Sequence, residues 1–342
     1  MGALASFDLF ARFLLSLSSP QKCLDVAPLC EALSDKSPVV STEKAPADKL
    51  SREGQANTAD AAPIDHSRFS LAEGDLEFLR HAVAADDDEL KSRIFAIQKK
   101  SYSTYPYPCL LNYAFVTGKL RFHPVYQRVL AAGRGGDAVF LDIGCCMGTD
   151  VRRLVYDGYA GRNVFATDLR KSFLDDGHEL YRDASTSKIT FFPSDVFDLP
   201  TPSSPASSEP CETPLSQVSR LSDLRNQVTH MYIALLFHLF DEASQYEIAL
   251  KVGSLLKRTS GSIIFGRHQG AEEAVVISDK FLPDRFAHSP ESWRDLWIKV
   301  FTELEGAEFA LTRVAVDAQL RTSGFTFGKV SGRVLDWSVS IL

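Results

Sequence analysis

The 342-residue chain lacks the features that mark two broad classes of protein. It has no run of Lys or Arg longer than two residues, and its net charge is −7. Because nucleic-acid-binding faces depend on clustered basic side chains, we expect no nucleic-acid partner. No apolar stretch approaches the roughly 18 residues that a membrane-spanning helix requires, so we also expect no membrane partner.

Phosphate-binding glycine motifs and metal-ligand spacings are also missing. The chain contains neither the G-x-G-x-x-G fingerprint of dinucleotide-binding folds nor a P-loop ending in G-K-[ST]. Its six cysteines match no zinc pattern, and the histidines outside the candidate site show no ligand spacing, so we expect no metal. Cysteines without a disulfide framework indicate reduced thiols in a cytoplasmic protein.

The chain divides into an N-terminal extension and one catalytic domain. Its apolar start is interrupted by Asp8 and Arg12, and we interpret it as an amphipathic helix or an uncertain gene start rather than a secretory signal. The stretch from Ser34 to Ser67, rich in Ser, Ala, Asp, Lys and Pro, is typical of a disordered linker. The expected parts are an extension at 1–68, a helical lid or cap at 69–130, and a main domain at 131–342 with an exposed insertion at 201–226.

The stretch from Val139 to Gly148, VFLDIGCCMG, predicts a strand, a tight turn and the start of a helix. Gly144 and Gly148 lack a Cβ atom, so the backbone can turn sharply and a ligand can lie against it. The D-x-G-x-x-x-G order that begins at Asp142 fits the acidic glycine loop of S-adenosylmethionine (SAM) enzymes, whose ligand has no phosphate. The alternative is a purely structural turn in some other α/β protein.

Two further predicted strands end in polar side chains. The run from Asn163 to Leu169 contains Asp168, which lies 20 residues past the glycine loop, where an acid in such folds accepts hydrogen bonds from two ribose hydroxyls. The third strand is followed by Ser194, Asp195 and Val196. In a nucleoside pocket an acid there accepts the adenine amino group, while its apolar neighbour lines the ring. The alternative for Asp195 is a solvated loop residue.

Two amphipathic helices are predicted between Leu71 and Ile97, ahead of a segment rich in Pro and Tyr. Pro106 and Pro108 each favour extended backbone at the preceding residue, so Tyr105 and Tyr107 are expected in a stiff, non-helical segment. The tyrosines either pack on the core after a helix terminator or form a lid over the ligand cleft.

The rest of the chain completes an alternating α/β pattern. The remaining predicted elements are strands at Val228–Leu236 and Ser260–Gly266, a helix at Ala243–Lys257, a helix that Ser289 caps and Pro290 begins, and closing strands at Glu308–Asp317 and Phe325–Leu342. This order predicts an α/β fold with a Rossmann-like seven-stranded mixed sheet and an N-terminal helical extension.

Together these motifs resemble those of the class I SAM-dependent methyltransferases found in fungal meroterpenoid and polyketide gene clusters. The resemblance covers roughly Leu71 to Asp317 and rests on LDIGCCMGTDVRRLVYDGY, NVFATDL, FFPSDVFDL, ALLFHLFDE and LLKRTSGSIIFGRHQG, with YPYPC upstream and HSPESWRDLW downstream. The generic loop motif is D-x-G-x-G-x-G, and Cys146 stands at its middle glycine position, a departure that belongs to the group.

The resemblance implies SAM-dependent methylation of a small secondary metabolite, of terpenoid or polyketide type, at a carboxyl, phenol or enol oxygen. It also implies a soluble homodimer. Carried over by position, it assigns the SAM pocket to Asp142, Gly144, Gly148, Asp168, Leu169, Ser194, Asp195 and Val196, to which we add Cys145 of the loop and Tyr107.

Methyl transfer requires mainly that the acceptor oxygen, the methyl carbon and the sulfur are aligned. A carboxylic acid, with a pKa of about 4, is ionised at neutral pH, whereas a phenol, with a pKa of about 10, benefits from a base. His238, just past strand four, is the candidate base, with Asp241 or Glu242 to orient its ring. With a carboxylate acceptor His238 donates a hydrogen bond instead. The alternative is a histidine that packs or caps a helix.

Arg267 and His268, at the end of strand five, are expected to face the same rim of the cleft and to bind an anionic acceptor, because an Arg fork suits a carboxylate. The alternative is a solvated loop pair. His288, Trp293 and Trp297 are candidates for the wall of the acceptor site, although helical spacing favours core packing for the two tryptophans.

Other functions remain open at this stage. A catalytically silent methyltransferase-fold protein that binds SAM or a partner subunit is one, although Asp142, Gly144, Asp168 and Asp195 are all present. An NAD(P)-dependent oxidoreductase is less favoured because the dinucleotide fingerprint is missing. Protein or RNA methylation is a third possibility, and the acidic charge disfavours RNA. The sequence does not name the acceptor.

Overall fold

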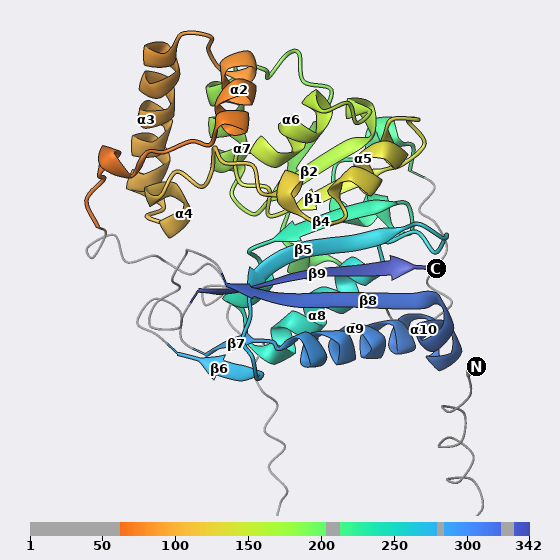
Figure 1. The fold of residues 1–342 in the computed structure, drawn as a ribbon. Coiled ribbons are helices and arrows are strands. Elements are labelled where there is room, and N and C mark those ends of the chain that lie inside the picture. The colour runs from red at the N-terminus through yellow and green to blue at the C-terminus, as the bar shows by residue number, and fades with distance from the viewer. Residues whose placement is uncertain (1–61, 203–212, 279–283, 323–331) are drawn as a thin grey trace, which may run out of the picture. The chain divides into compact units, whose positions relative to one another are not determined.

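A seven-stranded sheet organises the part of the protein that the computed structural model describes, residues 62–202, 213–278, 284–322 and 332–342 (Figure 1). Its strands are β1 (Phe140–Ile143), β2 (Val164–Asp168), β3 (Thr190–Pro193), β4 (His230–Ala234), β5 (Ile263–Gln269), β8 (Val314–Thr322) and β9 (Arg333–Ile341). A separate two-stranded sheet, which the sequence did not predict, consists of β6 (Val275–Ile277) and β7 (Arg285–Ala287).

The strand order is β3-β2-β1-β4-β5-β9-β8. Strands β1 to β5 are parallel, and β9 is antiparallel to both β5 and β8. This confirms the predicted seven-stranded mixed sheet and is the order expected for the class I methyltransferase fold. Because β1 pairs with both β2 and β4, the order reverses at β1, and ligands of open α/β sheets bind outside the carboxyl ends of the strands at such a point.

Helices connect and cover the strands. The α-helices are α2 (Glu73–Ala82), α3 (Asp87–Thr104), α4 (Pro108–Leu111), α5 (Tyr126–Gly133), α6 (Thr149–Tyr156), α7 (Lys171–Tyr181), α8 (Glu242–Gly253), α9 (Pro290–Glu305) and α10 (Ala307–Arg313). The short 3-10 helices are η2 (His66–Arg68), η3 (Leu120–Phe122), η4 (Gly161–Asn163), η5 (Val196–Asp198), η7 (Leu215–Gln217), η8 (Leu221–Leu224) and η9 (Phe237–Leu239). The boundary expected at residue 130 falls inside α5.

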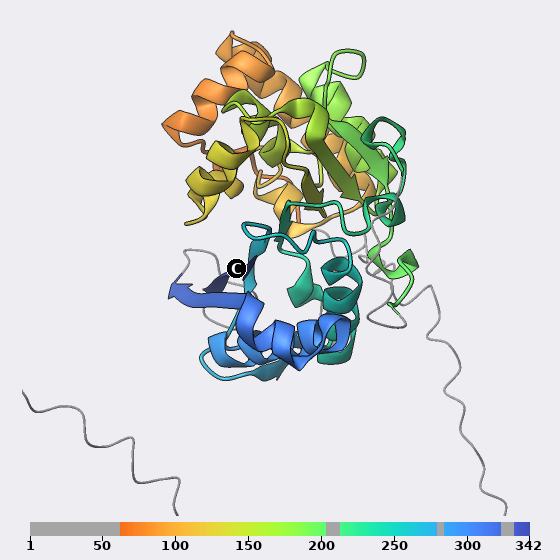
Figure 2. The ribbon, with the colours of Figure 1, turned by 90° about the vertical axis from the view of Figure 1, so that its right-hand side faces the viewer.

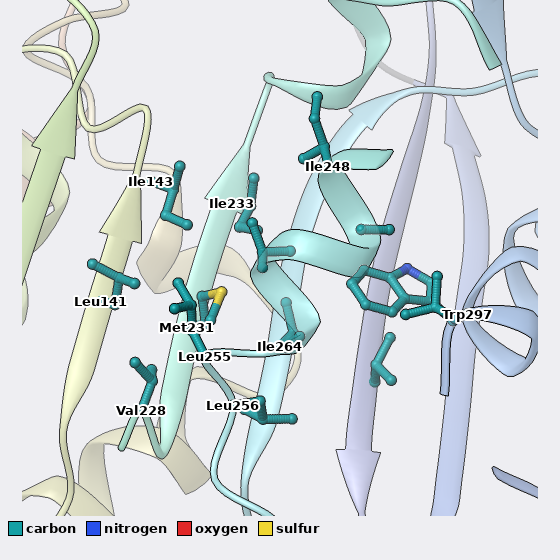
Figure 3. Close-up of a cluster of buried hydrophobic side chains, with 14 of the residues drawn as sticks. Leu141, Ile143, Val228, Met231, Ile233, Ile248, Leu255, Leu256, Ile264 and Trp297 are labelled. Atoms are coloured by element: carbon teal, nitrogen blue, oxygen red, sulfur yellow. The ribbon is translucent and has the colours of Figure 1, made fainter. Parts of the chain in front are cut away.

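Apolar side chains cover both faces of the sheet. On one face Met231 of β4 and Ile264 of β5 belong to a core cluster with α8 and with Trp297 of α9 (Figure 3). On the other face Phe265 of β5 lies in a second cluster with α5, α7 and Leu154 of α6. Strands that are buried on both faces read as near-continuous apolar runs, which is why β1, β2 and β4 were recognisable in the sequence.

The N-terminal helices α2, α3 and α4 pack against α7, on the side of the sheet that carries α6 (Figure 1 and Figure 2). Ser101 of α3 donates a hydrogen bond to the buried carboxylate of Asp176 on α7, and Lys100 pairs with the same carboxylate at 2.8 Å. The Gln98 amide donates to the carbonyl oxygen of Leu110 at 3.0 Å, which joins α4 to α3. This helical segment is therefore attached to the helix that follows β2.

Two sequence expectations about the ordered part are wrong. Residues Glu308–Arg313 form most of α10, and strand β8 begins only at Val314. The reason is local, because EFALTR consists largely of good helix formers whereas VAVDAQLRT alternates in polarity. The insertion expected to be exposed as far as residue 226 becomes part of the core before its end, since Val218, Leu221 and Leu224 are buried.

The expectation for the tyrosine segment is confirmed, and several others lie outside the described residues. Tyr105 and Tyr107 have extended backbone, with ψ of 93° and 143°. The apolar start, almost all of the linker and the Ser/Pro-rich residues 203–212 fall outside the described residues. The three described cysteines carry free thiols. Among the described helices, none is long and apolar enough to cross a membrane.

Candidate functional site

The loop between β1 and α6 has left-handed backbone at three of its residues. Gly144, Cys146 and Gly148 have φ angles of 79°, 52° and 70°. The amides of Gly144 and Cys145 both donate to the carbonyl oxygen of Thr167 on β2, at 2.9 and 3.0 Å. The amide of Gly148 donates to the carbonyl oxygen of Cys145 at 2.8 Å. The loop is thus a tight turn whose backbone is fastened to the neighbouring strand.

Asp168, at the end of β2, connects this loop to the end of β3. Its Oδ2 accepts a hydrogen bond from the amide of Cys146 at 2.8 Å, and its Oδ1 accepts from the amide of Arg170 at 3.0 Å. Its carbonyl oxygen accepts from the amide of Ser194 at 3.1 Å. Left-handed backbone costs a non-glycine residue roughly 1–2 kcal/mol, and the bond to a carboxylate offsets part of that cost at Cys146.

Three carboxyl groups lie around the loop, and burial raises the pKa of each. For Asp142 the rise is large, and the carboxylates of Asp150 and Asp168 add to it. At Asp150 the ammonium of Lys119 opposes the effect of burial on the pKa. At Asp168 burial raises the pKa, and hydrogen bonds from the amides of Arg170 and Cys146 oppose the rise. The loop is therefore an acidic environment, which favours a cation and disfavours a phosphate.

Two residues that were not predicted from the sequence lie against the carbonyl oxygen of Met147 in this loop. The guanidinium carbon of Arg152 lies 4.4 Å from the centroid of the Tyr181 ring and 4.6 Å from that of Phe191, and the guanidinium donates to the carbonyl oxygen of Met147 at 2.6 Å. Gly177 lies inside α7, where a Cβ atom would stand 2.5 Å from the same Met147 oxygen. A glycine within a helical pattern was the available signal, because it often marks a close backbone approach.

The end of β3 places the remaining predicted cofactor residues beside Asp168. The Oδ1 of Asp195 accepts from the amide of Phe197 at 2.9 Å, so the carboxylate caps η5. Val196 is buried, whereas the side chain of Leu169 is 45% exposed. The structure thus brings together the ends of β1, β2 and β3, as the sequence predicted.

Tyr105 and Tyr107 pack against the first turn of α7. Both rings meet Phe173 edge to face, with centroids 5.5 and 6.1 Å apart, and the Arg170 guanidinium lies 4.6 Å from the centroid of the Tyr105 ring. Because Arg170 also donates to Asp168, the tyrosine segment lies next to the strand end that carries the acid. The packing interpretation and the lid interpretation both remain compatible with this position.

His238 lies in η9, just past β4, as predicted. It is 7% exposed, and burial together with the nearby Arg285 guanidinium lowers its pKa to about 3. A neutral imidazole with so low a pKa is a weak base. Asp241 does not take the expected orienting position, because its carboxylate accepts from the amide of Ser244 at 2.7 Å and caps α8.

Arg267 and His268 do not face the same rim, because successive strand residues point to opposite faces of a sheet. The Arg267 guanidinium pairs with the carboxylate of Asp336 on β9, at 2.7 and 2.9 Å. The Nδ1 of His268 accepts from the indole N–H of Trp337 at 3.0 Å, and burial holds the pKa of His268 well below its usual value. The two residues therefore have different partners on different faces.

An aromatic cluster surrounds His268. The centroid of the Trp293 ring lies 4.6 Å from that of His268 and 5.1 Å from that of His288. Both tryptophans of α9, Trp293 and Trp297, are fully buried, as the core-packing interpretation predicted. Arg285 of β7, which the sequence analysis missed, donates to the Gln269 side chain at 3.1 Å. In the described part of the chain, no group of three or more His, Cys, Asp or Glu residues could hold a metal ion.

Comparison with known proteins gives consistent matches. Residues 67–116 match the family model of the meroterpenoid methyltransferase N-terminal domain. The chain is 36% identical over 211 residues to O-methyltransferase phiE of a fungal species, covering 61% of this chain and 65% of that protein. It is 32% identical to O-methyltransferase atr3 of Stereocaulon alpinum, covering 54% of this chain and 48% of that protein.

A third relative carries a more specific name. The Asnovolin E/Chermesin D methyltransferase nvfJ of Aspergillus novofumigatus is 29% identical, and the match covers 62% of this chain and 70% of that protein. The chain thus spans 65% of phiE and 48% of atr3, the first two relatives named here. These matches show that the chain is similar to fungal O-methyltransferases, and its strand order is that of the class I SAM-dependent methyltransferase fold.

Proposed function

We propose that the protein is a SAM-dependent methyltransferase that methylates an oxygen atom of a small secondary metabolite. The observation that carries the proposal is the acidic glycine loop, where Asp142, Asp150 and Asp168 gather around a backbone turn and burial raises the pKa of all three. When bound, SAM supplies a methyl group on a cationic sulfonium, and it also carries an ammonium group. Buried carboxyls with raised pKa values are stabilised in their charged form by such a ligand.

The same charge pattern weighs against a dinucleotide. The pyrophosphate of NAD(P) carries two negative charges and is held in other folds by helix N-termini and glycine-rich backbone. Here the first turn of α6 contains Asp150, and Asp142 and Asp168 stand on the adjoining strands. Like charges in a buried site repel strongly, so an oxidoreductase function is disfavoured.

The proposed cofactor contacts follow from the positions of the strand ends. The amide of Cys146 donates to one oxygen of Asp168 and the amide of Arg170 to the other, and we propose that the remaining acceptor positions of this carboxylate bind the ribose hydroxyls. Asp195 is proposed to accept the adenine amino group. The other proposed contacts, around the methionine end and the adenine ring, are Asp142, Gly144, Cys145, Gly148, Leu169, Ser194, Val196 and Tyr107.

On the acceptor side we propose His238 as a neutral hydrogen-bonding group and Arg267 as the group that binds an acceptor anion, whereas His268, which points to the opposite face of the sheet from Arg267, is not proposed to contact the acceptor. The low pKa of His238 favours an acceptor that is already ionised, a carboxylate rather than a phenol. Asp336 pairs with both Arg267 and Arg321, at 2.7 and 3.2 Å, so this group carries one positive charge in excess. A carboxylate would neutralise that charge.

The names of the relatives support the finer parts of the proposal. We propose an acceptor of terpenoid or polyketide type, since the matched family model is that of meroterpenoid methyltransferases and one relative is named for asnovolin E and chermesin D. We also propose a homodimer that acts in the cytoplasm. Size-exclusion chromatography with light scattering tests the dimer, and a mass of one chain would contradict it.

The experiment that tests the function begins with calorimetric titration of the purified chain with S-adenosylhomocysteine (SAH), with NAD as the comparison ligand. Micromolar binding of SAH alone is expected. Methyl transfer from labelled SAM is then measured with matched pairs of aromatic acids and phenols. Binding of NAD instead would contradict the proposal. SAH binding without turnover on any acceptor would favour a catalytically silent binding protein.

A further inference from the structure

Lys251, in the third turn of α8, has a buried side chain although it carries a charge. The residue is 4% exposed. Its Nζ donates to the carbonyl oxygens of Phe197 and Leu199, at 2.7 and 2.6 Å, and pairs with Oε1 of Glu247 at 3.2 Å. A buried ammonium is stable only if its three donors are satisfied, and these contacts satisfy them. Lys251 thus joins α8 to the turn that follows β3.

That turn is η5, which begins directly after Asp195. The backbone of Phe197 is held at both of its polar groups, because its N–H donates to Oδ1 of Asp195 at 2.9 Å while its carbonyl oxygen accepts from Lys251 at 2.7 Å. The amide of Asp198 donates to the carbonyl oxygen of Asp195 at 3.1 Å. The Lys251 ammonium and the Asp195 carboxylate are therefore connected through the backbone of a single residue, Phe197.

We propose that Lys251 is a positioning residue that holds the Asp195 carboxylate for recognition of adenine, and so contributes to the choice of nucleoside. This inference rests on the proposed function, in which Asp195 accepts the adenine amino group. One oxygen of Asp195 caps η5, so the direction of the other is set by the position of that turn. A 6-oxo base presents an acceptor at the place of the amino group and is repelled by a carboxylate.

Loss of the Lys251 contacts is expected to change the relative affinity for two nucleosides, which a general loss of stability does not do. Loss of the Lys251 ammonium leaves two carbonyl groups without their donor, and η5 is free to shift with the carboxylate that caps it. A shift of Asp195 weakens binding of an adenine nucleoside, but it hardly affects a hypoxanthine nucleoside, which gains nothing from that carboxylate. A general loss of stability would weaken both ligands together.

The test is calorimetric titration of the full chain with SAH and with S-inosylhomocysteine, in which the adenine amino group is replaced by oxygen. The wild-type protein is expected to prefer SAH by about 10-fold or more, since hydrogen bonds to charged groups are worth at least that factor. Lys251→Met is expected to weaken SAH binding by about 10-fold and the inosine analogue by less than about twofold. Lys251→Arg is expected to restore part of the preference.

Two matched variants complete the design. Glu247→Gln, one turn earlier on α8, removes the carboxylate partner but leaves both carbonyl contacts of Lys251, so the preference for SAH is expected to persist. Asp195→Asn keeps a cap for η5 but allows an amide to face either base, so the preference is expected to collapse. Thermal unfolding of every variant confirms that the comparison is made on folded protein, and Lys251→Gln replaces Lys251→Met if the latter does not fold.

The outcomes separate the two proposals. Equal weakening of both ligands by Lys251→Met, or an unchanged preference for SAH, would overturn the positioning role. An unchanged preference in Asp195→Asn would overturn it as well, because the carboxylate would then not read the base. Failure of the wild-type protein to bind either nucleoside would instead overturn the proposed function on which this inference rests.

Discussion

The carboxyl ends of β1 to β3, proposed as the cofactor side of the site, and those of β4 and β5, proposed as the acceptor side, are built differently. On the cofactor side, backbone amides of the loop after β1 bond to the next strand along the chain, β2, as Cys146 does to Asp168, 22 residues away. The ionisable groups there are acids whose pKa burial raises. On the acceptor side, partners come from distant segments, such as Arg267 and Asp336, which are 69 residues apart.

The ionisable groups on the acceptor side also respond to burial in the opposite direction. Burial lowers the pKa of His238 to about 3 and that of His288 to about 4. Buried acids favour a cationic ligand, whereas buried neutral histidines offer hydrogen bonds without charge. We therefore propose that the two sides suit different ligands, a cationic cofactor and an acceptor that needs little proton transfer.

The largest expected effect comes from the cofactor loop. Gly148→Ala would place a Cβ atom 2.6 Å from Phe191 and 2.7 Å from Arg152, at a residue with φ of 70°. Strain in the left-handed region costs roughly 1–2 kcal/mol and overpacking roughly 1–3 kcal/mol, so SAH affinity is expected to fall by about 100-fold or more in a calorimetric titration. Gly261→Ala is the matched control, since Gly261 has φ of 89° and nothing lies within 4 Å of its added Cβ.

A variant on each side separates binding from turnover. Asp168→Ala removes the proposed ribose contacts and the bond to Cys146, so SAH affinity is expected to fall by about 10-fold or more. His238→Ala is expected to leave SAH affinity nearly unchanged and to lower turnover. Asp175→Asn, at an exposed position on α7, controls for the loss of a charge. Unchanged SAH affinity in Asp168→Ala would show that β2 does not contribute to the cofactor site.

On the acceptor side, Arg267→Ala is expected to raise KM for a carboxylate acceptor by about 10-fold and to leave KM for a phenol unchanged. Asp336 keeps an arginine partner in this variant, because Arg321 lies 3.2 Å from it, so the loss of stability is expected to be modest. Arg321→Ala is the matched control for Asp336. An equal rise in KM for both acceptors would assign Arg267 a purely structural role.

The part of the fold that the sequence predicted consists of elements with a strong local pattern. Strand β4 was recognisable from the apolar run that begins at Met231, and α9 from Ser289 and Pro290, which form its cap and first residue. Helix α10 was misread because a short helix and a strand follow each other without a turn signal between them. The hairpin of β6 and β7 was missed because strands of three residues carry too little periodicity.

The same distinction holds within the candidate site. Asp142, Gly144 and Asp168 stand directly at strand ends, where the sequence alone could locate them. The partner of Arg267 could not be found in this way, because opposite charges occur throughout the chain and only the register of β5 and β9 brings Asp336 beside it. Lys251 was invisible for the same reason, since helical lysines are usually solvated.

The smallest expected effect is a pH dependence of stability that arises from the acceptor side. The pKa of His288 is lowered by burial from 6.5 to about 4, so the folded state keeps this imidazole neutral while the unfolded chain takes up a proton. The unfolded state therefore binds more protons as pH falls below about 6.5, and stability decreases until about pH 4. Between pH 7 and pH 6 the loss from this one group is about 0.7 kcal/mol.

Urea unfolding at both pH values, for the wild-type protein and His288→Gln, measures this contribution. The wild-type protein is expected to lose more of its free energy of unfolding than the variant does, whereas His81→Gln, at an exposed position, should behave like the wild-type protein. The raised pKa values of Asp142, Asp150 and Asp168 act in the opposite direction, because those folded carboxyls bind protons more readily than unfolded ones. These three carboxyls are present in both proteins, so the difference in pH dependence between the wild-type protein and His288→Gln measures the contribution of the histidine alone. An identical pH dependence in both would mean that His288 is protonated as easily in the folded state as in the unfolded chain, and the contrast between acidic and neutral sides would then rest on His238 and His268.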